Sequence, residues 1–369
     1  MRIVQLANFH APTSGGLRTM VDRLAAGYRR AGHSVVQILP GPRDRTVVGP
    51  WGLRIELAAP RVHACYRLVT RPSRVWNLVR TLEPDVVELN DRTTMVPVAH
   101  RAHAAGIPVV LISHERIEGM LEGRLPAAGV RRALADRWNR SLGASLDVVV
   151  CPSAYGGVEW RRVGAEVEVV PWGVDLDDLH PPAHPVETPA DQIRLVHLGR
   201  FSAEKRTPLV PAAAAELSAR GWRVHLTMVG DGPLRSRLPS PAGVDVAYEG
   251  FVTDRTRLAR LLGAADVGIQ PCPVETFGLS ILETLACGTP VVVSDRGAAT
   301  ALAAPGAIIG AASDPGAIAD AAEDLRRRDR GAARLASRRR AAEFDADGAV
   351  ERMLAIHGGF DGRRSALAS

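Results

Sequence analysis

The apolar positions near the start of the chain follow two different periods. Residues 3–7 and 34–39 are short, mostly apolar runs of the kind found in the strands of a buried sheet. Between them, apolar side chains recur at the three- to four-residue spacing of one helix face. The order strand, loop, helix, strand is the unit that builds parallel sheets. The helical positions are Leu17, Met20, Val21, Leu24 and Tyr28.

The same order recurs in the second half of the chain. Residues 193–198 and 223–229 predict strands on either side of a helix at 209–217. Further apolar runs predict additional strands in each half, so we expect an α/β protein with two parallel sheets. These runs are residues 85–89, 108–113, 147–151 and 167–170 in the first half, and 244–248, 267–270 and 291–294 in the second.

A proline-rich segment at 180–189 separates the two halves and cannot form a regular element. We therefore expect an N-terminal domain at residues 1–173, a hinge and linker at 174–190, and a C-terminal domain at 191–347. Apolar positions at helical spacing near the end of the chain predict a final helix within 348–369.

The composition is that of an ordinary globular protein, with 46% hydrophobic and 23% charged residues in a chain of 369. No apolar run approaches the roughly 18 residues of a membrane span, and the first residues lack the apolar core of a signal peptide. The four cysteines have no paired spacing, which argues against a metal site or a disulfide framework. We expect a cytoplasmic protein without a cofactor or a metal.

A formal net charge of +6 favours anionic partners. The arginine clusters at 326–328 and 338–340 alternate with alanine and acidic residues, as on solvated helix faces. Aromatic side chains that would stack on bases are not interleaved with them, so nucleic acid is not an expected partner.

A second basic stretch, residues 124–145, carries an apolar stripe of Val130, Leu134, Trp138 and Leu142. Packing of this stripe into the core is the favoured interpretation. The alternative is a basic amphipathic helix that lies on an anionic bilayer, which would make the protein peripheral to the inner face of the cell membrane.

Two carboxylates flank the predicted start of a short helix late in the chain. Glu275 precedes Gly278 in a loop, and Glu283 lies in the apolar stretch that ends at Gly288. A helix start attracts phosphate through its unpaired N–H groups, while a nearby carboxylate accepts hydrogen bonds from sugar hydroxyls. This combination suits a nucleotide sugar; a capped core helix with two solvated acids is the alternative.

Arg200 and Lys205 follow the first predicted strand of the second domain, at the edge where open parallel sheets bind ligands. Two cations there would stabilise the charge that grows on a leaving diphosphate, although a surface salt bridge would look the same in sequence. Gly15 and Gly16 end the loop after the first strand, where backbone N–H groups can approach a diphosphate. His114 ends a strand of the first domain.

The double glycine, Arg200 with Lys205, the turn at 230–233, and Glu275 eight residues before Glu283 together resemble glycosyltransferase family 4. Within that family, the chain is most similar to the actinobacterial phosphatidylinositol mannoside α-mannosyltransferases. The resemblance implies a GT-B fold, with two Rossmann-like domains facing across a cleft and a C-terminal helix that crosses back to the N-terminal domain. It also implies metal-independent transfer of a hexose, with retention of configuration, from a nucleoside diphosphate sugar. GDP-mannose is the expected donor, and a glycolipid such as a phosphatidylinositol mannoside is the expected acceptor.

The resemblance also implies roles for individual residues. Arg200 and Lys205 would bind the diphosphate, Glu275 the sugar hydroxyls, and His114 would position the sugar near the reacting carbon. Glu283 would bind the ribose, and the backbone after residue 250 would meet the base. The full set expected to contact the nucleotide sugar is Gly15, Gly16, Gly232, Phe251, Val252, Thr276, Phe277, Gly278, Leu279 and Glu283.

The acceptor is expected on the N-terminal domain, where Arg67 and Asp91 are candidates; Asp91 could equally cap a helix. Two rival functions stay open. One is a transferase of the same fold that moves another sugar onto a natural product or small molecule. The other is a nucleotide-binding scaffold without catalysis, against which the intact set of Arg200, Lys205 and Glu275 argues.

Overall fold

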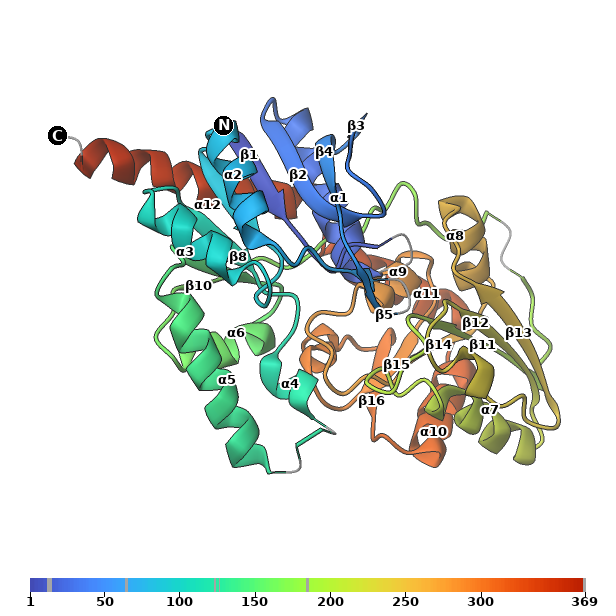
Figure 1. Cartoon of the computed structure of the whole chain (residues 1–369). Coiled ribbons are helices and arrows are strands. Elements are labelled where there is room, and N and C mark those ends of the chain that lie inside the picture. Colours follow the sequence, from blue (N-terminus) through green and yellow to red (C-terminus); the bar gives the residue numbers. More distant parts are fainter. Residues whose placement is uncertain (12–14, 64–65, 123, 126, 184–185, 368–369) are drawn as a thin grey trace. The chain divides into compact units, whose positions relative to one another are not determined.

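The computed structural model divides into two compact units, each with its own sheet (Figure 1). Unit 1 comprises Met1–Pro171 and Asp347–Ser369, and unit 2 comprises Trp172–Ala346. The structure describes residues 1–11, 15–63, 66–122, 124–125, 127–183 and 186–367, with side chains of the last helix described as far as Phe360. Helices flanking two mainly parallel sheets confirm the predicted α/β class.

The sheet of unit 1 has the strand order β10-β9-β8-β7-β1-β2-β4-β3. Neighbouring strands run parallel, apart from β3 and β4, which form an antiparallel pair at one edge. Strands β7, β8 and β9 are buried at every position, because helices cover both faces of a parallel sheet. The strands are β1 Arg2–Leu6, β2 Ser34–Gly41, β3 Arg45–Gly49, β4 Gly52–Ala58, β7 Val86–Leu89, β8 Val109–Ile112, β9 Val148–Cys151 and β10 Val167–Val169, with a separate hairpin of β5 Arg61–His63 and β6 Tyr66–Arg67.

The last helix of the chain, α12, packs on unit 1 next to the first helix, α1. Gly27 of α1 makes the close approach possible, since a Cβ there would lie 2.9 Å from Cγ1 of Val350 on α12. No helix of the described residues is both long and apolar enough to cross a membrane. The helices of unit 1 are α1 Gly16–Arg30, α2 Pro72–Leu82, α3 Val96–Ala104, α4 Ile117–Leu121, α5 Ala128–Gly143, α6 Ala154–Arg161 and α12 Ala346–Leu367.

The sheet of unit 2 is parallel and has the order β13-β12-β11-β14-β15-β16. Its core is formed by apolar side chains of the central strands and of helices α7 and α10. The elements are β11 Gln192–Leu198, α7 Leu209–Ala219, β12 Arg223–Val229, η1 Arg235–Arg237, β13 Val244–Gly250, α8 Arg255–Gly263, β14 Val267–Gln270, α9 Leu279–Ala286, β15 Val291–Ser294, η2 Ala298–Leu302, β16 Ile308–Ala311, α10 Pro315–Arg327 and α11 Arg330–Ala342.

The predicted strands included the edge strands β10 and β13 but missed the opposite edge strands, β3 and β16, and the separate hairpin β5–β6. Strand β3 is half-exposed and the hairpin β5–β6 is short, so neither has the continuous apolar run that identifies a buried strand. Strand β16 is an edge strand of four residues that contains a glycine.

The favoured interpretation of the apolar stripe on α5 is confirmed for Leu142, which lies in the core, and is wrong for the other three residues. The side chains of Val130, Leu134 and Trp138 are 50%, 44% and 46% exposed. The buried residues of α5 are Ala135, Asn139 and Leu142. An amphipathic pattern alone does not say which face a helix turns toward the core.

Candidate active site

Each sheet contains a point at which the strand order reverses. In open parallel sheets, ligands bind outside the carboxyl ends of the strands at this switch point. In unit 2, β11 lies between β12 and β14, so the switch point is formed by the loops after β11 and β14. In unit 1, β1 lies between β2 and β7, so the loops after β1 and β7 form it.

An ion pair bridges the switch point of unit 2. Lys205 comes from the loop after β11 and Glu275 from the loop after β14, and Lys205 Nζ lies 2.6 Å from Glu275 Oε2. The side chains are 32% and 15% exposed, so both can reach a ligand. Burial by itself would lower the pKa of Lys205, but the Glu275 carboxylate outweighs it and raises that pKa above its ordinary value. The fold thus brings into contact two residues that were singled out in the sequence as candidates for binding the donor.

The backbone around Glu275 is held by the segment after β15. Ala298 N donates to the Glu275 carbonyl at 2.8 Å. Gly297 has a φ of +80°, and a Cβ there would lie 2.8 Å from the Pro273 carbonyl oxygen, so glycine is required on both grounds. Gly278, with φ +102°, precedes α9, and Phe277 packs edge-on against Phe344 with ring centroids 5.8 Å apart.

The loops after β11, β12 and β13 are joined by backbone hydrogen bonds at the same edge. Phe201 N donates to the Asp231 carbonyl at 3.0 Å, and Gly230 N donates to the Gly250 carbonyl at 2.8 Å. A Cβ on Gly232 would lie 2.5 Å from the Phe201 carbonyl oxygen, so the turn at 230–233 needs glycine to approach this closely. Arg200, which is half-buried, lies in the first of these loops.

The remaining donor-site candidates also lie on this edge of unit 2. Phe251 and Val252 follow β13 directly and are half-buried, and Thr276 and Leu279 flank the start of α9. Glu283 lies one turn into α9 and is 15% exposed, and its Oε1 accepts a hydrogen bond from Arg255 Nη1 at 3.0 Å. Their predicted contacts with a nucleotide sugar stay predictions.

Sequence reasoning missed two residues at the point where β11 and β14 stop pairing. Where these strands diverge, His197 Nδ1 lies 2.8 Å from the Ile269 carbonyl, and Gln270 Nε2 donates to the Leu198 carbonyl at 3.0 Å. Each side chain thus satisfies a backbone carbonyl of the other strand. The available signal was a polar residue inside each apolar run.

The switch point of unit 1 holds His114 and Asn90, which follow β8 and β7. His114 Nε2 lies 2.8 Å from Asn90 Oδ1. Burial, together with the nearby charge of Arg92, lowers the pKa of His114 to about 4, so the imidazole is neutral at physiological pH. Arg92 itself forms a buried ion pair with Glu159 at 2.8 Å.

The two acceptor candidates have partners close to them in sequence, Asp91 in its own loop and Arg67, which lies in β6 and not in a loop, across the hairpin β5–β6. Asp91 accepts hydrogen bonds from Thr93 N at 2.8 Å and from both threonine hydroxyls that follow it, the geometry of a residue that organises a turn. Arg67 Nη1 donates to the Ala59 carbonyl at 2.7 Å. Gly15 is exposed at the start of α1, and Gly16 is the first residue of that helix.

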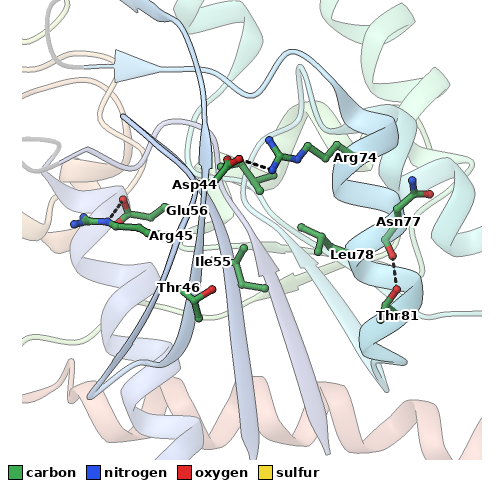
Figure 2. A pocket seen from close by; sticks show the side chains of 10 residues that line it. Asp44, Arg45, Thr46, Ile55, Glu56, Arg74, Asn77, Leu78 and Thr81 are labelled. Atoms are coloured by element: carbon green, nitrogen blue, oxygen red, sulfur yellow. Dashed lines mark hydrogen bonds and ion pairs between the residues drawn. The ribbon is translucent and has the colours of Figure 1, made fainter.

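A groove of about 490 Å³ lies elsewhere on unit 1, between β3, β4 and α2 (Figure 2). Its charged side chains pair with one another, Arg45 with Glu56 and Arg74 with Asp44. None of the predicted site residues lines it. Within the described residues, no cluster of three or more His, Cys, Asp or Glu side chains is arranged to hold a metal ion.

Comparison with known proteins assigns both halves of the chain to glycosyltransferase families. Residues 14–178 match the sequence model of glycosyltransferase family 4, and residues 192–328 match that of glycosyl transferases group 1. A GDP-mannose-dependent alpha-(1-6)-phosphatidylinositol dimannoside mannosyltransferase of Mycobacterium tuberculosis is 40% identical over 97% of this chain and 96% of its own. A GDP-mannose-dependent alpha-mannosyltransferase of Mycolicibacterium smegmatis is 28% identical over 83% of this chain and 82% of its own.

The solved structure of a sucrose-phosphate synthase from Thermosynechococcus elongatus matches with a TM-score of 0.79 at 20% identity, over 100% of both chains. A glycosyltransferase structure from Rickettsia africae matches with a TM-score of 0.70 at 16% identity, over 97% of this chain and 98% of its own. These likenesses confirm the predicted GT-B fold of two Rossmann-like domains. With the 40% identity to a mannosyltransferase over nearly its whole length, the chain is a member of glycosyltransferase family 4.

Proposed function

We propose that this glycosyltransferase moves mannose from GDP-mannose onto a glycolipid acceptor such as a phosphatidylinositol mannoside, with retention of configuration and without a metal ion. The observation that carries the proposal is the Lys205–Glu275 ion pair, which bridges the switch point of unit 2 at 2.6 Å. It puts a fixed cation for phosphate beside a carboxylate that can hold sugar hydroxyls. The choice of donor and acceptor follows the relative that is 40% identical.

The chemistry assigns a separate task to each side chain. Lys205 and Arg200 bind the diphosphate and stabilise the negative charge that develops when the bond to the anomeric carbon breaks. Glu275 holds hydroxyls of the transferred mannose and keeps Lys205 charged. The acceptor oxygen bonds to the anomeric carbon on the face from which the diphosphate leaves, and its proton passes to the departing diphosphate.

The rest of the donor would lie along the same edge of unit 2. Glu283 binds the ribose hydroxyls, with Arg255 fixing its carboxylate, and the backbone of Phe251 and Val252 meets the guanine. We further propose that His114 and backbone N–H groups of unit 1 contact the donor. The further contacts in this proposal are Gly15, Gly16, Gly232, Thr276, Phe277, Gly278 and Leu279.

The proposal is tested by incubating the purified protein with GDP-mannose and phosphatidylinositol dimannoside in detergent micelles. We expect GDP release coupled to formation of an α-linked product, identified by NMR of the anomeric proton, with no loss of rate in EDTA. UDP-glucose serves as the competing donor, because it is bound in a solved Anabaena structure that matches this chain with a TM-score of 0.72 at 17% identity. Turnover of UDP-glucose alone would support the rival donor, and turnover of neither would support a scaffold.

The exposed face of α4 and α5 supports a peripheral association with an anionic bilayer. Val130, Leu134 and Trp138 form an apolar row on α5, and Met120 on the adjoining α4 is 42% exposed. Such a row of large apolar side chains is unusual for a surface that faces water alone. Exposed arginines that would meet lipid phosphates surround it: Arg124, Arg132, Arg137 and Arg140.

Flotation with liposomes tests this surface. Vesicles that contain phosphatidylinositol should retain the wild-type protein, and pure phosphatidylcholine vesicles should retain much less. A Leu134→Ser, Trp138→Ser double variant should float poorly with either. Leu335→Ser is the matched control, because Leu335 is 52% exposed on unit 2. Equal retention of both variants would contradict the assigned surface.

A further inference from the structure

Four polar residues, here called the polar row, lie side by side across neighbouring strands of unit 1. Gln5 on β1 is in register with Glu88 on β7 and with Gln37 on β2, and Gln37 is in register with Arg54 on β4. Gln5 Nε2 donates to Glu88 Oε2 at 2.7 Å, and Gln37 Nε2 donates to Gln5 Oε1 at 3.0 Å. Arg54 Nε donates to Gln37 Oε1 at 2.9 Å. An unbroken chain of hydrogen bonds thus crosses four strands.

The charged groups at the two ends of the polar row determine which way the amide groups of Gln5 and Gln37 point. The Glu88 carboxylate needs a donor from Gln5, and the Arg54 guanidinium needs an acceptor from Gln37, so both amides must point the same way. Gln5, Gln37 and Glu88 are fully buried. Buried polar side chains are costly unless every partner is in place, so the polar row holds its members in a single arrangement.

At its Glu88 end, the polar row is closed by α1 and α12. Tyr28 Oη donates to Glu88 Oε1 at 2.6 Å, and His357 Nε2 lies 3.1 Å from the same oxygen. Burial and the Glu88 charge raise the pKa of Tyr28 well above its usual value, so the phenol keeps its proton. This end lies inside the protein.

At its Arg54 end, the polar row continues to a histidine in the loop after β1. Arg54 Nη2 lies 2.5 Å from Asp22 Oδ1, and His10 Nε2 lies 3.0 Å from the same oxygen. Burial alone would raise the pKa of Asp22, but His10 and Arg54 together lower it, so Asp22 is ionised. An ionised carboxylate only accepts, so Nε2 of His10 donates its proton to Asp22, and Nδ1 is the ring atom left for another partner.

The position of His10 in the fold would allow its Nδ1 to contact a ligand. His10 lies four residues past the end of β1, in one of the two loops that form the switch point of unit 1. Its side chain is 9% exposed, so the ring is enclosed but reachable from solvent. A ring nitrogen held in one position at a ligand-binding edge suits a hydroxyl group.

We propose that His10 Nδ1 accepts a hydrogen bond from a hydroxyl of the acceptor's sugar or inositol ring, with Asp22 and the polar row as positioning residues. This proposal rests on the proposed function, since it assigns the acceptor to the switch point of unit 1. His10 orients the acceptor and takes no proton in the transfer.

Amide substitutions separate this role from a structural one. The nitrogen of glutamine reaches the position of Nε2, so His10→Gln keeps the bond to Asp22 but loses the acceptor at Nδ1. Asparagine reaches the position of Nδ1, so His10→Asn keeps an acceptor there and loses the bond to Asp22. If His10 only stabilised the loop through Asp22, the His10→Gln variant would be as active as the wild type and the His10→Asn variant would not.

The assay uses GDP-mannose with phosphatidylinositol dimannoside in micelles, and GDP-mannose alone. We expect His10→Ala and His10→Gln to raise the KM for the acceptor about 3- to 10-fold, the value of one hydrogen bond, with His10→Asn less affected. GDP release without acceptor should be unchanged. His225→Ala is the control, because His225 also pairs with an aspartate, Asp245, at 2.8 Å, but near the start of β12.

A wild-type acceptor KM in both His10→Ala and His10→Gln would overturn the inference while leaving the proposed function intact. A wild-type acceptor KM in His10→Gln, with a raised KM in His10→Asn, would also overturn it. That result would instead mean that His10 only stabilises the loop through its bond to Asp22. A wild-type protein that transfers no mannose would overturn both the inference and the function on which it rests.

Discussion

The ion pair of Lys205 and Glu275 matters for chemistry more than for stability. A partly exposed pair contributes little to folding, typically about 0–1 kcal/mol. Its value lies in the fixed positions of the two groups before a ligand arrives, because preorganised charges need not reorient as negative charge develops. Lys205 remains protonated because Glu275 raises its pKa against the effect of burial.

Removing either partner should therefore affect turnover far more than folding. We expect Lys205→Gln and Glu275→Gln each to lower kcat/KM for GDP-mannose by about 10²- to 10³-fold, with little change in Tm. Arg220→Gln is a matched control, since Arg220 and Lys205 are both 32% exposed and both lie 2.6 Å from a carboxylate. Steady-state kinetics of GDP release give the comparison, and near-normal kcat/KM in the first two variants would refute the site.

At the scale of elements, the site depends on loops that hold one another. The loop after β14 carries Glu275, and the segment after β15 holds it through the hydrogen bond from Ala298. Strands β11 and β14 stop pairing after Val196, and beyond that point His197 and Gln270 each contact a backbone carbonyl of the other strand. A loop is more rigid when neighbouring elements supply its hydrogen bonds.

Two glycine substitutions test that dependence. Gly297→Ala and Gly221→Ala both place a side chain at positive φ, +80° and +93°, so each should lose about 1 kcal/mol of stability. A Cβ at Gly221 meets nothing within 4 Å, whereas one at Gly297 lies 2.8 Å from the Pro273 carbonyl oxygen. We expect only Gly297→Ala to lose activity, about 10-fold or more, because displaced catalytic groups react poorly. Thermal denaturation measures the stability of both variants, and steady-state kinetics measure their activity.

At the scale of the whole molecule, both units repeat one design, with a histidine close to the switch point that is half-buried in unit 1 and buried in unit 2. His114 in unit 1 and His197 in unit 2 have pKa values lowered by burial from 6.5 to about 4. Both rings are therefore neutral in the folded protein under conditions in which an unfolded chain would begin to protonate them.

This difference predicts how stability depends on pH. Between pH 6.5 and 4 the unfolded chain binds protons that the folded chain does not, so stability is full above 6.5 and falls as the pH is lowered toward 4. The free energy of unfolding should fall by at most about 1.4 kcal/mol per pH unit for each histidine. Urea unfolding of the wild-type protein and of His197→Gln measures it, and identical pH slopes in the two proteins would contradict the assignment for His197.

The sequence by itself determined the buried strands and the residues that follow them. Strands covered on both faces need apolar runs, so β9 and β15 could be predicted directly, whereas the exposed edge strand β3 lacks that signal. Lys205 and Glu275 could be singled out because each follows such a run, and parallel strands bring their carboxyl ends to one edge.

Tertiary structure alone decided which side chains meet. The 2.6 Å contact between Lys205 and Glu275, the pairing of Glu283 with Arg255, and the exposure of the α5 stripe each depend on elements distant in sequence. The polar row depends on register, and a shift of one residue in a strand would turn its side chain to the other face. Local sequence sets the period of each element, but register and packing are settled only when the strands pair.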